Sequence, residues 1–462
     1  MLAMQQKLQR YTIALLGLLG AVTASRAQPE SPDSLWNLNQ CIDYAIEYNL
    51  QVKRQELMLQ STDQDLRQSK LDLLPNLNAG FEHQLGAGRV LDRGTYEWKN
   101  ANVSQGDLGL QSDLTLFNGL QGLNTMKMSK ANYLMNKEQL EAMEDEVILR
   151  VMTGYLDLLR NRELVDVAQH KVEVTQEQVD RMERLVSVGN EPQGKLLDVN
   201  AQHSAAKLAL TQAVNSREIA RLTLMHTMNL TVPEAFEIEA PDLPDPSAVE
   251  IPVLDSVFQY ALAYLPQIKS AEYGIESQER MLAIRRGQRS PRLYARGLYY
   301  SNYSDGLINP RDPNPGNPTM DYPLSQQVTD NQYKQVSMGL DIPIFNRWNV
   351  QTNINKAKID LEDAQVQYST AVLELQQSIQ QYHTEALAAR DNYTAALEAV
   401  ANSNEAYRFA EERFKVGTGT ALELQEARNQ LYQSTAEMIT SKYVLIFYTK
   451  ILDFYMGRPI EF

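Results

Sequence analysis

The chain has 462 residues, a formal net charge of −15 at pH 7 and a single cysteine. A chain this acidic is a poor candidate for a nucleic-acid-binding protein, which needs a basic surface to meet phosphate groups. One cysteine also excludes an intramolecular disulfide framework, and we expect Cys41 to act as a small buried hydrophobic residue.

The first 27 residues have the pattern of a secretory signal peptide. Lys7 and Arg10 precede the apolar run IALLGLLGAV, and small residues at 25 and 27 offer a cleavage site. The apolar run is too short to span a bilayer, and Cys41 lies too far downstream to carry a lipid anchor. We therefore expect residues 1–27 to be removed and the rest to be exported.

The sequence contains an internal repeat. YAIEYNLQVK at 44–53 returns as YALAYLPQIK at 260–269, and DLTLFN at 113–118 returns as DIPIFN at 341–346. The second copy is longer because it holds a Pro- and Asn-rich insert at 301–323, a composition typical of an exposed loop.

These correspondences divide the chain into two predicted structural repeats, 28–252 and 253–462. A proline-rich, acidic stretch at 230–252 has the composition of an irregular connector between them. In each repeat we expect the order helix, strand, strand, long helix, helix. The opening helical segments, about 38–72 and 253–288, each end before a proline, as helices commonly do.

Four segments alternate apolar and polar residues with the period of a β-strand. Each would have one apolar face and one polar face. The predicted strands cover about 76–86, 107–117, 292–302 and 335–345.

A long segment without proline follows each strand pair. From Asn118 to Val188 and from Asn346 to Met456, apolar residues recur at spacings of three and four, which predicts helices. A helix from 346 to 416 would be roughly 105 Å long at 1.5 Å per residue. This length exceeds that of an ordinary globular helix and favours coiled-coil-like or tubular packing.

The DLTLFN and DIPIFN motifs lie where a strand meets a long helix. Phe117 and Phe345 end the apolar faces, where interfacial aromatic residues occur in membrane proteins. A core contact beneath the helix start is an equal alternative for Phe345. Asn118 and Asn346 suit the N-cap position of the helices that follow.

A ten-residue amphipathic strand is long enough to cross a bilayer at a tilt, but only as part of a closed barrel. Four strands cannot close a barrel. Either the strands lie on a soluble core, or several chains each contribute four; a dimer would supply eight strands and a trimer twelve.

Together these features resemble the TolC-like outer-membrane efflux proteins, also called outer membrane factors. The resemblance rests on the repeat, on Pro75 and Pro291 before strands, on the LFNG and IFNR junctions, and on Val-Gly turns followed by LLDVNAQ or ALELQEARNQL. It implies a mainly α fold, in which a homotrimer forms a 12-stranded β-barrel in the outer membrane, continued by a long α-helical barrel in the periplasm.

The same resemblance implies a function and partners. The protein would be the passive exit duct of a tripartite efflux or type I secretion system. Its expected partners are outer-membrane lipid, a periplasmic adaptor (membrane fusion) protein and an inner-membrane transporter of the RND or ABC type.

The resemblance also assigns roles to the turns near 188–195 and 413–420. Glu423 and Glu426 would ring the periplasmic entrance and favour cations; the alternatives are a helix cap for Glu423 and an ordinary solvated face for Glu426. Phe414 replaces the family's tyrosine and Gly419 stands where the family has arginine, so closure would rest on other contacts. The implied tip and adaptor-contact residues are Val188, Gly189, Phe414, Val416, Gly417 and Gly419.

The sequence offers no catalytic constellation. It has no HExxH, GxSxG or phosphate-binding loop, and its five histidines lack metal-ligand spacing. We therefore expect no enzyme activity, cofactor or metal. The alternative to an exit duct is a soluble periplasmic coiled-coil scaffold or adaptor, although such a protein would not need four amphipathic strands.

Overall fold

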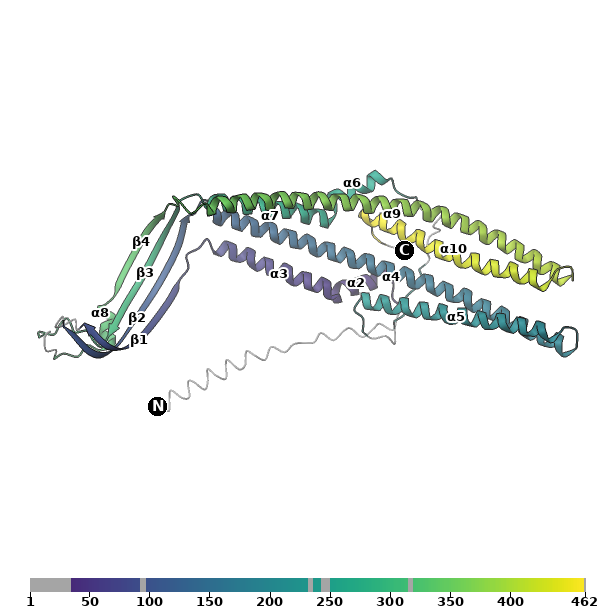
Figure 1. Ribbon diagram of the computed structural model, residues 1–462, viewed down its shortest axis with the longest axis horizontal. Coiled ribbons are helices and arrows are strands. Elements are labelled where there is room, and N and C mark those ends of the chain that lie inside the picture. Colours follow the sequence, from purple (N-terminus) through teal and green to yellow (C-terminus); the bar gives the residue numbers. More distant parts are fainter. Residues whose placement is uncertain (1–34, 92–96, 232–235, 242–249, 315–318, 461–462) are drawn as a thin grey trace, which may run out of the picture.

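The computed structural model describes residues 35–91, 97–231, 236–241, 250–314 and 319–460. The predicted signal peptide lies outside these residues. The molecule is elongated, with a small sheet at one end and long helices running from it to the other end (Figure 1).

The two opening helical segments are each broken into a pair of helices. The breaks fall between α2 (Leu38–Tyr48) and α3 (Leu50–Leu71), and between α6 (Leu254–Tyr264) and α7 (Pro266–Gly287). The side-chain oxygen of Asn49 accepts hydrogen bonds from the amides of Gln51 (2.8 Å) and Val52 (3.4 Å), which starts a new helix. In the second pair, Pro266 occupies the first helical position, where its missing N–H costs nothing.

One antiparallel sheet holds all four strands in the order β1-β2-β3-β4. The strands are β1 (Asn78–Leu91), β2 (Trp98–Phe117), β3 (Arg292–Ser304) and β4 (Tyr333–Asp341). The prediction that the fourth strand continues to 345 was wrong, because Pro343 has no N–H to donate to a ladder. β1 and β2 pair beyond the predicted ranges, at residues such as Ala87 and Asn102, where the sequence loses its apolar–polar contrast.

The long helices begin later than predicted. α4 (Gln121–Ser187) and α9 (Asn349–Lys415) start after residues in the left-handed region, with φ 60° at Leu120 and 64° at Trp348. These two residues occupy the N-cap positions, so the N-cap assignment of Asn118 and Asn346 was wrong. Both asparagines still accept from a first-turn amide, Asn118 from Gly122 (3.4 Å) and Asn346 from Val350 (3.5 Å).

Each long helix folds back into a shorter partner. α4 packs along α5 (Gln193–Thr227), and α9 packs along α10 (Ala421–Tyr455). α4 and α9 both have 67 residues, roughly 100 Å at 1.5 Å per residue, and α5 and α10 both have 35. None of the helices in the described ranges is both long and apolar enough to cross a membrane. The two helical hairpins end side by side, far from the sheet (Figure 1).

The main hydrophobic core lies where α2, α4, α5 and α10 meet, near the middle of the molecule. Cys41 is fully buried there, and Val257, its counterpart in the second half, is fully buried in a second cluster between α6, α9 and α10. Burial raises the pKa of the Cys41 thiol to about 12, so it stays protonated. The interpretation of Cys41 as a small core residue is confirmed.

The insert in the second half folds over the edge of β3. β4 starts opposite Tyr300, so the last four residues of β3 have no strand beside them on that side. The short helix α8 (Leu324–Asp330) takes that place. The Gln327 side chain accepts from the Ser304 amide (2.8 Å), and the Asn331 side chain donates to the Asn302 carbonyl (2.8 Å).

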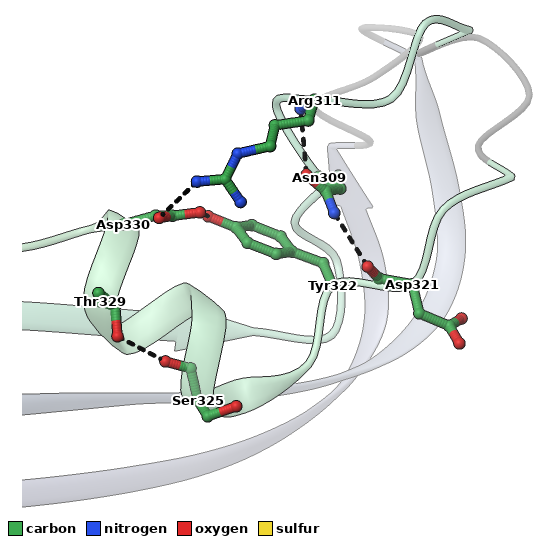
Figure 2. A network of polar contacts seen from close by, with 7 residues as sticks. All are labelled: Asn309, Arg311, Asp321, Tyr322, Ser325, Thr329 and Asp330. Atoms are coloured by element: carbon green, nitrogen blue, oxygen red, sulfur yellow. Dashed lines mark hydrogen bonds and ion pairs between the residues drawn. The ribbon is translucent and has the colours of Figure 1, made fainter.

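Further polar contacts fold the rest of this loop onto α8 (Figure 2). Arg311 forms an ion pair with Asp330 (3.2 Å), and the Asn309 amide group donates to the Asp321 carbonyl (3.0 Å). Asn309 is buried. The described part of the insert is therefore a folded cap on the end of the sheet, held by side-chain contacts.

Replacing Asn49 by alanine tests the break between α2 and α3. The change removes the cap of α3 and the hydrogen bond from Asn49 to the Thr227 carbonyl (3.0 Å). Loss of a cap costs about 1 kcal/mol, and loss of a partly buried partner about 1–2 kcal/mol more. We expect Asn49→Ala to lower the free energy of unfolding by about 2–3 kcal/mol, measured by denaturant titration with far-ultraviolet circular dichroism. Asn404→Ala, on an exposed face of α9, is the control, and equal losses in both variants would contradict the capping role.

Candidate functional site: the tip turns and the two faces of the sheet

The two turns at the far end of the helical hairpins have the same backbone design. Gly189 and Gly417 lie in the left-handed region, with φ 78° and 80°. In the second turn, the Gly417 amide donates to the Phe414 carbonyl (3.1 Å) and the Thr418 amide to the Arg413 carbonyl (2.9 Å). This pair of bonds is a Schellman motif, and the first turn repeats it. The sequence-based placement of Gly417 just after the helix end agrees with this geometry.

Gly419 is required by close packing in the second turn. Its amide donates to the Arg413 carbonyl (3.0 Å). A Cβ atom at this position would lie 3.0 Å from the Arg413 Cβ and 3.1 Å from the Phe414 nitrogen. An arginine, which the resemblance leads one to expect here, would need Arg413 and Phe414 to shift by a few tenths of an ångström.

The two carboxylates after the turn have different surroundings. Glu423 and Thr420 form a capping box, in which each side chain accepts from the other's amide (3.1 and 3.2 Å). Arg413 also lies 3.7 Å from the Glu423 carboxylate. Glu426 is exposed, and no residue in the described ranges gives it a hydrogen bond or ion pair. Glu423 is thus occupied by the cap, while the charge of Glu426 faces water.

Apolar and aromatic side chains surround the turns. The guanidinium of Arg181, near the end of α4, lies 5.3 Å from the centre of the Phe414 ring, a cation–π contact between the two hairpins. Val188 and Val416 are 68% and 71% exposed. The tips therefore present hydrophobic surface to solvent within a single chain.

A buried arginine lies close behind this exposed end and was not anticipated from the sequence. Arg428 on α10 is buried, and desolvation lowers the pKa of its guanidinium. Tyr407, Glu411 and Tyr432 lie close enough to oppose that effect. Lys171 of α4 packs over the Tyr432 ring at 5.7 Å, which links the hairpins again. Nothing in the sequence separates Arg428 from an ordinary surface arginine, since its burial depends on packing of distant helices.

At the other end, the sheet has one apolar face and one polar face. The register places Leu110 opposite Ala79 and Tyr299, and Val336, on the same face, is 85% exposed. This apolar face is therefore bare in the single chain. Its other members include Leu77, Phe81, Leu85, Leu108, Met338 and Leu340, all exposed.

The polar face carries a ladder of charged and aromatic groups. Arg296 forms an ion pair with Asp113 at 2.6 Å. Its guanidinium and that of Arg292 lie 6.0 and 5.5 Å from the centre of the Tyr294 ring. The Tyr300 hydroxyl donates to Asp107 further along the same face. These residues occupy alternate positions of β2 and β3, as the period-two pattern requires.

Phe117 and Phe345 lie at the base of the sheet, where strands give way to helices. They are 44% and 79% exposed in the single chain. The alternative of a core contact for Phe345 is therefore not what the structure has. Asn118 and Asn346 hold the first turns of α4 and α9 from outside the N-cap position.

Gly419→Ala tests the packing of the second tip turn. Because the added Cβ would press against Arg413 and Phe414, we expect the turn to loosen. Amide hydrogen exchange at Thr418 and Gly419, whose N–H groups both bond to Arg413, should then speed up at least about tenfold. Gly194→Ala in the first tip is the matched control, because a Cβ there meets nothing within 4 Å. Unchanged exchange in the Gly419 variant would refute the close packing.

Comparisons with solved structures agree with this architecture. The chain superimposes on CusC with a TM-score of 0.74 at 16% identity, covering 94% of this chain and 96% of CusC. VceC of Vibrio cholerae gives 0.74 at 15%, covering 92% and 97%, and the open state of the Neisseria gonorrhoeae MtrE outer membrane channel gives 0.71 at 18%, covering 91% and 88%. At these identities the likeness concerns the fold alone.

Sequence comparisons identify the family. The outer membrane efflux protein BepC of Brucella suis biovar 1 (strain 1330) is 22% identical over 349 residues, 74% of this chain and 71% of BepC. Outer membrane protein TolC of Salmonella enteritidis is 23% identical over 227 residues, 45% of this chain and 46% of TolC. The family model for outer membrane efflux proteins matches twice, at residues 41–230 and 257–446. The chain therefore belongs to the outer membrane efflux protein family.

Proposed function

We propose that three copies of this chain form the outer-membrane exit duct of a tripartite efflux or type I secretion system. Membership in the outer membrane efflux protein family places the protein in the outer membrane, with its helical part in the periplasm. The observation that carries the proposal is the four-stranded sheet, which is open at both edges and has a bare apolar face.

An open sheet with this surface needs partners. Among the residues that the structure describes, β1 and β4 each pair with a strand on one side only, so their outer edges hold unpaired amides and carbonyls. In hydrocarbon such groups cost several kcal/mol each, unless another strand pairs with them. Identical chains that pair β4 with the next β1 supply those bonds, and three chains close a ring of twelve strands.

The two faces of the sheet then have separate environments. The apolar face, with Phe81, Leu110 and Val336, would turn to lipid, and Phe117 and Phe345 would lie at its periplasmic border. The polar ladder of Arg292, Tyr294 and Arg296 would line the water-filled interior. Each predicted repeat, 28–252 and 253–462, would contribute one strand pair and one long helical hairpin to the wall.

The tips would be the periplasmic entrance and the docking point for the adaptor. The exposed Val188 and Val416, with the rigid turns at Gly189, Gly417 and Gly419, offer a defined surface for that partner. Phe414 would hold the two hairpins of one chain together through Arg181. An inner-membrane transporter of the RND or ABC type would deliver cargo through the adaptor.

Of the two carboxylates at the entrance, Glu426 is the better candidate for ion selectivity. Three copies would place three exposed, unpaired charges around the opening. Glu423 would act mainly as a cap, since its carboxylate already bonds to Thr420. The rival function, a soluble scaffold or adaptor, leaves the apolar face of the sheet without a purpose, and no contact in the structure favours it.

Val336→Arg tests the lipid-facing side of the sheet. An arginine on this face costs about 2–4 kcal/mol near the middle of a membrane. We expect far less trimer in the outer-membrane fraction, measured by light scattering after detergent extraction. Gln335→Arg, one residue away on the polar face, should assemble normally. Equal assembly of the two variants, or a wild-type chain that is monomeric without detergent, would refute the proposed barrel.

Glu426→Gln tests the entrance. In planar bilayers under a salt gradient, the wild-type channel should prefer cations, and this variant should shift the reversal potential toward zero. Glu398→Gln, on an exposed face of α9 far from the turn, is the control and should leave the potential unchanged. A wild-type reversal potential that Glu426→Gln does not move would exclude this residue from selectivity.

A further inference from the structure

A cavity of about 520 Å³ lies near the middle of the molecule, away from the tips and the sheet. It opens where α4 passes α3, the break between α6 and α7, and the end of α10. Its size is within the range of pockets that hold drug-sized molecules, about 300–1,000 Å³. The residues that matter below are Asp145, Glu146, Leu149, Leu265, Phe454 and Tyr455.

The lining combines apolar and aromatic side chains with neutral polar ones (Gln55, Gln139, Gln267 and Ser270) and an acidic pair. Asp145 and Glu146 are its ionisable carboxylates, and the lining contains no lysine, arginine or histidine. Glu146 already pairs with Arg150 at 3.4 Å. Asp145 is half-buried, and no described residue gives it a hydrogen bond or ion pair. The cavity therefore has one carboxylate whose charge no residue in the described ranges neutralises.

The ionisable groups around Asp145 lie on α4, α3 and α10, and those that act on it directly are acidic. Burial, together with the negative charges of Glu144 and Glu141, raises the pKa of Asp145 to about 6, although Glu141 also pairs with Lys137 at 3.3 Å. Across from α4, Glu56 of α3 acts on Glu144, and Tyr455 of α10 faces Asp145 directly. The surroundings thus favour either a proton or another cation at this carboxylate.

The wall of the cavity opposite Asp145 is aromatic, and contacts between aromatic rings hold it in place. The Tyr455 ring stacks on Tyr382 of α9, with centroids 5.9 Å apart and planes 29° apart. Burial raises the pKa of the Tyr455 hydroxyl to about 12, so it stays neutral. Phe454, beside it, packs edge-on against the same ring. Such a surface suits a flat or apolar body, and an aromatic face also attracts a positive charge.

We propose that this cavity binds an organic cation with an aromatic or apolar body, its charge beside Asp145 and its body against Leu149, Leu265 and Phe454. Charge complementarity selects the class of ligand, because an anion would meet two carboxylates and no basic group in the lining, and a neutral body would leave Asp145 uncompensated. The inference rests on the proposed function only in suggesting that the bound cations are cargo of the duct.

The test uses the purified full chain in a nonionic detergent, with ethidium as the probe and fluorescence as the readout. At pH 8 Asp145 is ionised and binding should be strongest. Binding should weaken about tenfold by pH 5, because protonation through a pKa of about 6 removes the charge. The neutral dye N-phenylnaphthylamine should bind more weakly and without this dependence on pH.

Asp145→Asn should weaken ethidium binding at pH 8 about tenfold and abolish the dependence on pH. The variant should fold, since it removes a charge that burial disfavours. Asp166→Asn, on an exposed face of the same helix, is the matched control and should bind as the wild type does. Equal affinity in the Asp145 and Asp166 variants, or equal affinity at the two pH values, would overturn the proposal.

Bilayer conductance separates this inference from the proposed function. A protein that conducts but does not bind ethidium overturns the cation site and leaves the duct intact. A protein that binds ethidium in the expected way but does not conduct overturns the duct and leaves the site.

Discussion

Unsatisfied backbone groups at the two edges of the sheet constrain this molecule more than any other feature. β1 and β4 have partners on one side only, and the face that they share is apolar and bare. A polar edge beside an apolar face is stable neither in water nor in hydrocarbon unless both are covered. In the proposed duct, strands from identical chains and the acyl chains of lipid would meet these two needs together.

The helices continue from the base of the sheet into an aqueous compartment. At the base of the sheet, short connections lead from β2 to α4 and from β4 to α9, and the left-handed residues Leu120 and Trp348 turn the chain into each helix. Equal lengths of 67 residues bring both hairpin turns to the same level. The two hairpin tips therefore lie at the same end of the molecule, and the contact between Arg181 and Phe414 joins the two hairpins there.

Much of this fold could be predicted because duplication made each signal appear twice. The four strands, the long helices and the glycine turns follow from periodicity, missing prolines and Val-Gly pairs. The helix breaks at Asn49 and Leu265 were missed, because apolar periodicity continues across them while a cap or Pro266 resets the backbone. Strand ends were misplaced where Pro343 stops a ladder or where pairing continues through polar residues.

The candidate functional residues, like the fold, could be predicted from the sequence only in part. For Glu423 the sequence left a pore role and a helix cap open, and the hydrogen bonds to Thr420 show that the carboxylate caps the helix, whereas Glu426 stays exposed. Arg428 and Asp145 could not be singled out, because their burial arises from helices that lie far apart in the chain. The local sequence pattern predicts the backbone conformation well, whereas the environment of a charged side chain depends on residues that are far away in the sequence.

The fold of the insert has a consequence for how the outer end of the molecule can diversify. Gln327 and Asn331 hold α8 against β3 with side-chain amides, in place of a further strand. The described residues between them and Ser304 form no part of the strand ladder, so the exposed ones can change while those two amides and the contacts of Asn309 and Arg311 are kept. Substitutions at those exposed positions would leave the pairing of β3 and β4 beneath them intact.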